Sequence, residues 1–189
     1  MAKALFLDRD GTLIEDTGNA HKLEDLRLFP DTVEALKLAR DQYRFYIITN
    51  QPGIARGLFT VEQFHAFNNK LVGMLAAQGV YIEETRFCPH LGGCDCRKPS
   101  TKHLLELARK YGLDVEDSWV LGDHPSDVEM GVRAGCRTVY LLTGHGRKHL
   151  GELETRGLKP TVIASSLLEA VEALMNHGDQ GNTSGPQET

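Results

Sequence analysis

The chain has 189 residues, of which 41% are hydrophobic and 25% charged, and a formal net charge of −5 at pH 7. This length favours one domain, and the composition is that of an ordinary globular protein. The acidic balance argues against binding to nucleic acid through bulk electrostatics, and the sequence has neither a signal-peptide pattern nor an apolar run long enough to span a membrane. We therefore expect a cytoplasmic monomer whose partners include neither nucleic acid nor membranes.

Short apolar runs alternate with amphipathic segments along the chain. The runs typical of buried strands span residues 3–8, 44–50, 79–88, 118–123, 136–142 and 160–165. The segments with helical spacing and capping residues span residues 30–41, 60–78, 100–112, 125–134 and 167–175. This alternation predicts an α/β fold, namely a three-layer, Rossmann-like parallel sheet with helices on both faces.

The predicted elements fill most of the chain and leave no segment long enough for a large cap domain. We expect residues 1–176 to form a single domain, with a short loop inserted at 88–98. Residues 177–189 contain no large apolar side chain, so they are expected to form a disordered tail.

Three aspartates follow predicted strands. Asp8 and Asp10 come at the end of the first strand, in "LDRDGT", and Asp123 ends the fourth, in "LGDHPSD". Since the carboxyl ends of parallel strands meet at one edge of the sheet, the three carboxylates can converge, where they would repel one another unless a cation joined them. Oxygen ligands of this kind suit Mg²⁺, although a single aspartate after a strand is more often a turn cap. The set predicts a Mg²⁺ site formed by Asp8, Asp10 and Asp123.

Potential phosphate contacts follow the second strand and precede a predicted helix. Thr49 and Asn50 end the strand, and Lys98 stands before a proline and the helix start. A hydroxyl, an amide and backbone N–H groups can hold phosphate oxygens, and a lysine can neutralise them. Each residue alone is more often an ordinary loop or surface residue. Combined with a carboxylate nucleophile, a second carboxylate as acid and a metal, they predict phosphoryl transfer through an aspartyl-phosphate.

Four potential metal ligands with C-x-H-x₃-C-x-C spacing lie close together in the chain: Cys88, His90, Cys94 and Cys96. Three thiolates and an imidazole can close a tetrahedral structural Zn²⁺ site, and the alternative is a set of free thiols beside a surface histidine. The expected role of a zinc loop over 88–98 is to hold Arg97 and Lys98 rigidly at the mouth of the site.

The motifs "DRDGT", "TNQ", Lys98 before Pro99 and "GDHPSD" together resemble the four motifs of the haloacid-dehalogenase (HAD) superfamily phosphatases. The match is closest to the heptose-bisphosphate and histidinol-phosphate phosphatase branch and covers about residues 5–146. The resemblance implies a Mg²⁺-dependent phosphomonoesterase with a structural Zn²⁺ loop. It implies that Asp8 attacks phosphorus, that Asp10 acts first as acid and then as base, and that Asp10 contacts the metal through its backbone carbonyl.

The same resemblance assigns the remaining roles. Thr49 and Lys98 stabilise the phosphoryl group, Asp123 completes the metal site, and Asp127 supports it from one helical turn further on. Three loops, at 13–29, 51–59 and 88–98, rim the site. The implied substrate-binding residues are Asp16, Thr17, Gly18, Asn19, Asn50, Gln51, Pro52, Arg97 and His124.

The expected substrate is a small phosphorylated metabolite. A heptose bisphosphate is favoured, and histidinol phosphate is the alternative within the branch. A phospho-accepting signalling module is the alternative from another class, because such modules also combine acidic residues, Mg²⁺, a threonine and a lysine on a parallel sheet. That alternative offers no use for Asp10 as an acid or for a zinc loop.

Overall fold

The strands of the sheet carry apolar side chains on both faces, as a parallel sheet between two helical layers requires. The computed structural model describes residues 1–179 and contains one sheet with strand order β3-β2-β1-β4-β5-β6, in which every pairing is parallel. The strands are β1 (Lys3–Leu7), β2 (Tyr43–Asn50), β3 (Ile82–Cys88), β4 (Trp119–Gly122), β5 (Arg137–Leu141) and β6 (Val162–Ala164).

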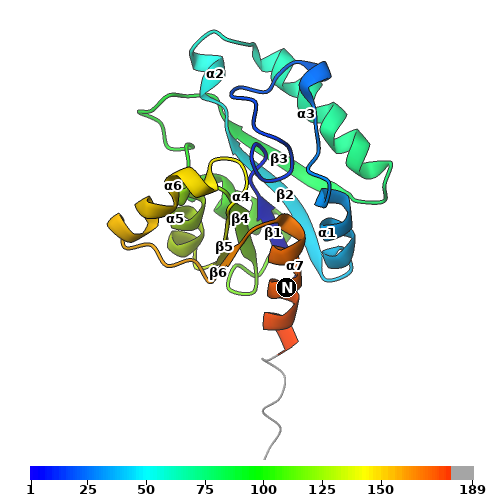
Figure 1. The fold of residues 1–189 in the computed structure, drawn as a ribbon, viewed down its shortest axis with the longest axis vertical. Helices are drawn as coiled ribbons and strands as arrows, with labels where there is room; N and C mark the ends of the chain where they lie inside the picture. The colour runs from blue at the N-terminus through cyan, green and yellow to red at the C-terminus, as the bar shows by residue number, and fades with distance from the viewer. Residues whose placement is uncertain (180–189) are drawn as a thin grey trace, which may run out of the picture.

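The helices cover both faces of the sheet, with α5 and α6 on one side and α1 and α3 on the other (Figure 1). The helices of the described residues are η1 (Leu23–Asp25), α1 (Thr32–Ala39), α2 (Pro52–Ala55), α3 (Val61–Ala76), α4 (Lys102–Tyr111), α5 (Pro125–Ala134), α6 (Gly146–Thr155) and α7 (Leu167–Asp179). The three-layer α/β fold predicted from the sequence is confirmed. No helix in the described part of the chain is both long and apolar enough to cross a bilayer.

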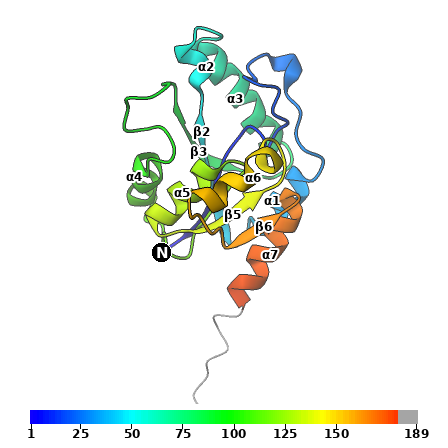
Figure 2. The same ribbon diagram turned by 60° about the vertical axis from the view of Figure 1, so that its left-hand side comes forward.

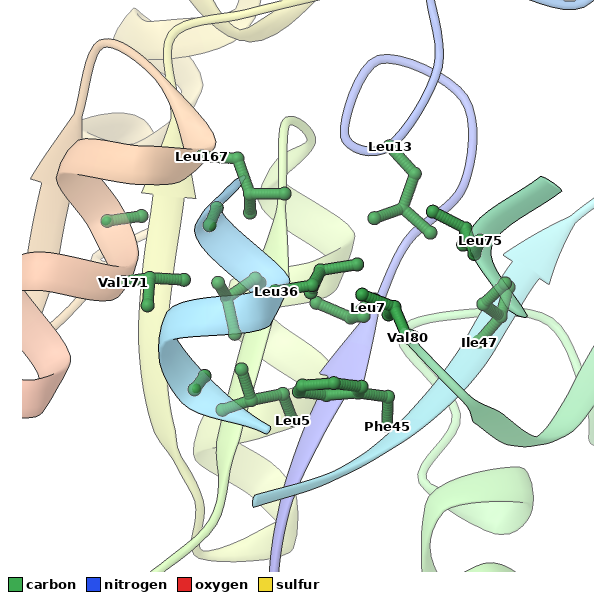
Figure 3. Packing of buried hydrophobic residues seen from close by; sticks show 14 of the residues in the cluster. Leu5, Leu7, Leu13, Leu36, Phe45, Ile47, Leu75, Val80, Leu167 and Val171 are labelled. Atoms are coloured by element: carbon green, nitrogen blue, oxygen red, sulfur yellow. The ribbon is translucent and has the colours of Figure 1, made fainter. Parts of the chain in front are cut away.

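Side chains alternate in direction along β1 and so join two of the three hydrophobic clusters of the described residues. Leu5 and Leu7 face one layer, where they join Leu36 of α1 and residues of α3 and α7 (Figure 3). Ala4 and Phe6 face the other layer, which α4 and α5 cover. Figure 2 shows the same two layers from another side, with α4 and α5 opposite α1 and α7. Burial on both faces makes β1 a rigid base for the residues that follow it.

The strand order reverses at β1, which lies between β2 and β4. In a parallel sheet, chains leaving two such strands turn to opposite faces, and the crevice between them is where ligands bind. The register places Leu7 beside Ile47 of β2 and beside Leu121 of β4. The residues that follow these strands, including Asp8 and Asp123, therefore emerge at the same edge.

The predicted domain division remains a prediction. Helix α7 continues to Asp179, beyond the predicted start of the tail at residue 177, and residues 180–189 lie outside the described residues.

Candidate active site

The loop after β1 brings its backbone very close to Asp123. The N–H of Asp8 donates to the carbonyl of Leu121 at 2.9 Å, which extends the pairing of β1 with β4. Gly11 has φ +82°, and a Cβ there would lie 2.2 Å from Asp123 Oδ2. Gly144 has φ +47° and would place a Cβ at the same distance from the same atom. Both positions require glycine, because any side chain would collide with the Asp123 carboxylate.

Three carboxylates and one lysine converge at this edge of the sheet. Oxygen atoms of Asp8, Asp123 and Asp127 lie within 4.8 Å of one another. Lys98 Nζ donates to Asp8 Oδ1 at 2.7 Å and forms an ion pair with Asp127 Oδ1, also at 2.7 Å. Lys98, Asp123 and Asp127 are all buried. One ammonium cannot neutralise three carboxylates, so the cluster keeps a negative charge that a cation would balance.

Burial and like charge disturb the titration of this cluster. Burial raises the pKa of Asp8 to about 7; Lys98 opposes this shift, and Asp127 and Asp10 add to it. Burial also raises the pKa of Asp123 to about 8, with further contributions from Asp8 and Asp127. For Lys98, burial favours the neutral amine, but Asp127 and Asp8 outweigh it and raise the pKa above its usual value. Without a bound cation, Asp8 and Asp123 therefore ionise only at a higher pH than an ordinary aspartate.

We predict that the metal-free protein loses stability as pH rises from about 4 to about 8. The folded-state pKa values of Asp8 and Asp123, about 7 and about 8, lie above the ordinary value of 3.8. The folded chain then binds more protons than the unfolded chain in this window, so its stability is greatest at the acid end and falls with increasing pH. The pertinent quantity is the Tm of the wild type minus that of Asp123→Asn, measured in EDTA.

This Tm difference should become more negative by several degrees between pH 5 and pH 8, because each kcal/mol shifts Tm by about 2–4 °C in a chain of this size. Asparagine keeps an oxygen that can accept the bond from the His145 N–H, which lies 2.7 Å from Asp123 Oδ2. Adding a divalent cation should raise the Tm of the wild type only. A difference that grows more positive with pH would contradict the raised pKa values.

The carboxylate of Asp10 has a separate set of partners. Arg9 donates to both of its oxygens, from Nε to Oδ2 and from Nη2 to Oδ1, each at 3.0 Å. Gln51 Nε2 donates to Oδ2 at 2.8 Å, and the Thr49 hydroxyl lies 3.5 Å from the same oxygen. Asp10 is not a member of the group formed by Asp8, Asp123 and Asp127 within the described residues. Its assignment as a metal contact through the backbone carbonyl stays a prediction.

The four residues with metal-ligand spacing also converge. Ligand atoms of Cys88, His90, Cys94 and Cys96 lie within 4.8 Å of one another, and the Sγ atoms of Cys88 and Cys96 are 3.0 Å apart. Burial raises the pKa of Cys88 to about 12, whereas the backbone N–H of Cys96 is the first of several groups that lower the pKa of Cys94 to about 6. Donor atoms of this chemistry, grouped without a disulfide, fit a tetrahedral zinc ion.

The cysteine loop is tied directly to the end of β2. The Lys98 N–H donates to Asn50 Oδ1 at 3.0 Å, and Asn50 Nδ2 donates back to the Lys98 carbonyl at 3.4 Å. The N–H of Gln51 donates to the Cys88 carbonyl at 2.7 Å. These bonds hold the backbone of Lys98 against β2, so a rigid loop at 88–98 would fix where the lysine side chain begins.

A cavity of about 440 Å³ opens beside the carboxylates. It is lined by Asp8, Asp10, Thr49, Lys98, Asp123 and Asp127 and by five of the predicted substrate residues: Asp16, Asn50, Pro52, Arg97 and His124. The other four predicted substrate residues, Thr17, Gly18, Asn19 and Gln51, are not among the described residues that line it. The structure thus brings the proposed catalytic residues and about half of the proposed substrate contacts around one hollow.

His145 and Arg9 are among the residues at the site that sequence reasoning missed, as are Ser126 and Arg156 in the cavity lining. His145 lines the cavity, its N–H binds Asp123, and its ring lies 3.4 Å from Asp16 Oδ2. It stands in a glycine-rich turn after β5 that gives no pattern in the sequence. Arg9 was missed despite an available signal, since a charged residue at the end of a buried strand needs a partner.

A cluster of strand-end aspartates with a buried lysine, at the switch point of a sheet with this order, is the arrangement of a HAD-like hydrolase. The sequence model of the family described as HAD-hyrolase-like matches residues 95–170. The chain is 34% identical to D-glycero-D-manno-heptose-1,7-bisphosphate 7-phosphatase of Thermosynechococcus vestitus over 188 residues, covering 92% of this chain and 96% of the relative. It is 38% identical to D-glycero-alpha-D-manno-heptose-1,7-bisphosphate 7-phosphatase of Campylobacter jejuni over 142 residues, covering 74% and 82%.

The solved structures agree with the sequence relatives. The crystal structure of D,D-heptose 1,7-bisphosphate phosphatase from B. bronchiseptica, complexed with magnesium and phosphate, superposes with a TM-score of 0.83 at 30% identity, covering 94% of this chain and 99% of that chain. The chain therefore belongs to the D-glycero-D-manno-heptose-1,7-bisphosphate 7-phosphatase family. The resemblance inferred from the sequence motifs is confirmed.

Proposed function

We propose that this protein is a Mg²⁺-dependent phosphomonoesterase that removes the 7-phosphate of D-glycero-D-manno-heptose 1,7-bisphosphate. The observation that carries the proposal is the buried Lys98 between Asp8 and Asp127, at the base of a polar cavity of about 440 Å³. Relatives that are 34% and 38% identical carry this activity in their names. We expect the protein to act as a monomer on a small phosphorylated metabolite.

The proposed reaction uses two carboxylates in two steps. Asp8 forms a bond to phosphorus while the bond between phosphorus and the sugar oxygen breaks, and Asp10 gives its proton to that oxygen. Water then attacks the phosphorus of the aspartyl-phosphate and gives a proton to Asp10 while the bond between phosphorus and the Asp8 oxygen breaks. Inorganic phosphate leaves, and both residues are restored. Lys98 favours the ionised form of Asp8 and, with Thr49, balances the negative oxygens of the phosphoryl group.

The residues at the site fit a magnesium ion. The oxygens of Asp8 and Asp123 are close together and under-neutralised, and these two residues with the carbonyl of Asp10 would hold the ion. Asp127 supports Lys98 through their ion pair at 2.7 Å. When bound, magnesium offsets the charge that accumulates on the phosphoryl oxygens.

The substrate is tested by phosphate release across a panel of esters. The panel contains both anomers of the heptose bisphosphate, histidinol phosphate, other sugar phosphates and a 3′-phosphorylated oligonucleotide. We expect kcat/KM for one heptose anomer to exceed that for every other ester by about tenfold or more, since each added phosphate or hydroxyl contact contributes about 1–3 kcal/mol. A preference for histidinol phosphate or the oligonucleotide would replace the proposed substrate.

We also propose that Cys88, His90, Cys94 and Cys96 hold a structural zinc ion. Cys94→Ser should lose the zinc that native mass spectrometry detects in the wild type and should increase hydrogen exchange over residues 88–98. Activity should fall about 10–100-fold, because Arg97 and Lys98 directly follow the last ligand. Cys136→Ser is the matched control, since Cys136 is buried in the core apart from this group. Zinc content that is equal in wild type and Cys94→Ser would remove the site.

A further inference from the structure

Arg9 is a fully buried charged residue to which the proposed reaction gives no task. Its side chain is 0% exposed, a rare state for a guanidinium. The centre of the guanidinium lies 4.8 Å from the ring centroid of Phe67 and 5.3 Å from that of Phe64, both on α3. Nη2 also donates to the carbonyl of Ala20 at 3.2 Å. These contacts leave the guanidinium with one orientation.

That orientation presents a two-point fork to Asp10. Nε and Nη2 each donate at 3.0 Å, one to each oxygen of the carboxylate, which fixes the plane of the carboxylate as well as its position. The Asp10 side chain remains 18% exposed and lines the cavity. The fork therefore holds Asp10 from the core side and leaves it accessible from the cavity.

The two oxygens of Asp10 are not equivalent. Oδ2 accepts from Arg9 Nε and from Gln51 Nε2, the latter at 2.8 Å, and lies within reach of the Thr49 hydroxyl. Oδ1 accepts only from Arg9 Nη2 among the described residues. A proton carried by Asp10 loses the fewest bonds when it sits on Oδ1.

We propose that Arg9 is the positioning residue of Asp10: it holds the carboxyl so that Oδ1 is the oxygen that exchanges a proton with the reacting groups. The proposal rests on the proposed function. Proton transfer needs the donor within hydrogen-bond reach of the ester oxygen, so a carboxyl that turns freely in the cavity is a poorer acid. Removing the two hydrogen bonds from Arg9 should slow the steps that need a proton from Asp10 and leave the rates of the other steps nearly unchanged.

The test compares two esters with Arg9→Met, which keeps the length of the side chain and removes the fork. Release of an alkoxide from the heptose bisphosphate needs a proton, whereas release of p-nitrophenolate from p-nitrophenyl phosphate does not. Because kcat/KM reports the step up to loss of the leaving group, it should fall about 10–100-fold for the heptose ester and less than about threefold for the aryl ester. Equal losses on the two esters would overturn the proposal, because a structural role predicts them.

Two further variants separate the positioning role from a loss of stability: Arg9→Lys, and Arg9→Met combined with Asp10→Asn. Lysine keeps the charge but offers no fork, so Arg9→Lys should show the same inequality between esters with a nearly native Tm. In an Asp10→Asn background, Arg9→Met should change kcat/KM for the heptose ester by less than about threefold, because residues that act as a unit are not additive. If Arg9→Met lowered kcat/KM in the Asp10→Asn background by the same factor as in the wild type, the proposal would be overturned. Arg27→Met, at an exposed arginine of the 13–29 loop, is the control for loss of a charge.

Failure of the proposed function gives a different result. If the wild type hydrolyses p-nitrophenyl phosphate but not the heptose ester, the substrate proposal is wrong, and Arg9 is then tested on whichever alkyl phosphate of the panel the wild type hydrolyses. An inequality between that alkyl ester and the aryl ester would still support the positioning role, and its absence would overturn it.

Discussion

Asp8→Asn should lower the rate of phosphate release by about 10⁴-fold or more with Mg²⁺ present, because the amide cannot attack phosphorus. The fold should survive the change. Asp8 is buried among like charges, and removing its charge relieves the cost of burial and the repulsion that together raise its pKa to about 7. In the wild type, Lys98 Nζ lies 2.7 Å from Asp127 Oδ1, and we expect this ion pair to remain in the variant.

The measurement is phosphate release alongside thermal unfolding. Asp41→Asn is the matched control, since the Asp41 side chain is 92% exposed and is not among the residues that line the cavity. We expect the control to retain the wild-type rate and Asp8→Asn to match or exceed the Tm of the metal-free wild type. Activity within tenfold of the wild type in a folded Asp8→Asn protein would refute the nucleophile assignment.

Lys98→Met should have the second-largest effect, on both stability and rate. The lysine is buried and bonded to Asp8 and Asp127, so removing it leaves two carboxylates without their cation. Breaking a buried ion pair by deleting one partner costs about 3–5 kcal/mol, and we expect the free energy of unfolding of the metal-free protein to fall by that amount. Mg²⁺ should restore part of the stability. The rate should stay about 10²–10³-fold below that of the wild type, because the lysine ammonium no longer balances the negative oxygens of the phosphoryl group.

A second lysine ion pair of equal length provides the control. Lys102 Nζ lies 2.7 Å from Asp95 Oδ2, but its side chain is 42% exposed and that of Asp95 is 77% exposed. Lys102→Met should therefore change the free energy of unfolding by no more than about 1 kcal/mol. Denaturant unfolding of both variants decides the matter: similar losses would show that burial of Lys98 is not what makes its pair strong.

The parts of the fold that the sequence predicts well are those with a local physical signature. The strands show apolar runs, and α5 begins at Pro125 and ends at Ala134, as predicted. Helix α6 was not predicted, because only Gly146 and Leu153 are buried within it and two such positions make no periodic stripe. Helix α2 is a single turn within a loop, too short for any helical pattern to appear.

The positions of site residues at strand ends could be predicted from the sequence. The positions of site residues in loops could not, because they depend on the direction in which each loop turns. Asp8 and Asp123 meet because β1 and β4 are neighbours. The alternation of strands and helices implies only that the two strands end at the same edge of the sheet. The segment Thr17 to Asn19 was expected at the substrate, but Gly18 and Asn19 both adopt positive φ, 73° and 85°, and the loop turns so that neither lines the cavity. Backbone turns of this kind depend on tertiary contacts that a single sequence does not display.

The partners of Asp10 illustrate the same limit. The "DRDGT" pattern places Arg9 next to Asp10 but does not say that the arginine points back onto its neighbour. Gln51 was expected to touch substrate, which stays a prediction. Its side chain donates to Asp10 Oδ2 at 2.8 Å and to the Thr49 hydroxyl at 2.9 Å, which the sequence did not indicate. Those bonds depend on how the loops after β1 and β2 fold toward each other at the sheet edge.

The most direct test of the account is to trap the covalent intermediate on Asp8. The enzyme is mixed with the heptose bisphosphate and Mg²⁺, quenched in acid within milliseconds, and digested for peptide mass mapping. We predict a phosphoryl group on Asp8 that appears within one turnover and disappears as inorganic phosphate accumulates, at a rate no slower than kcat. Phosphate release with Asp8 never modified, or a phosphorylated Asp8 that persists without release, would contradict the account.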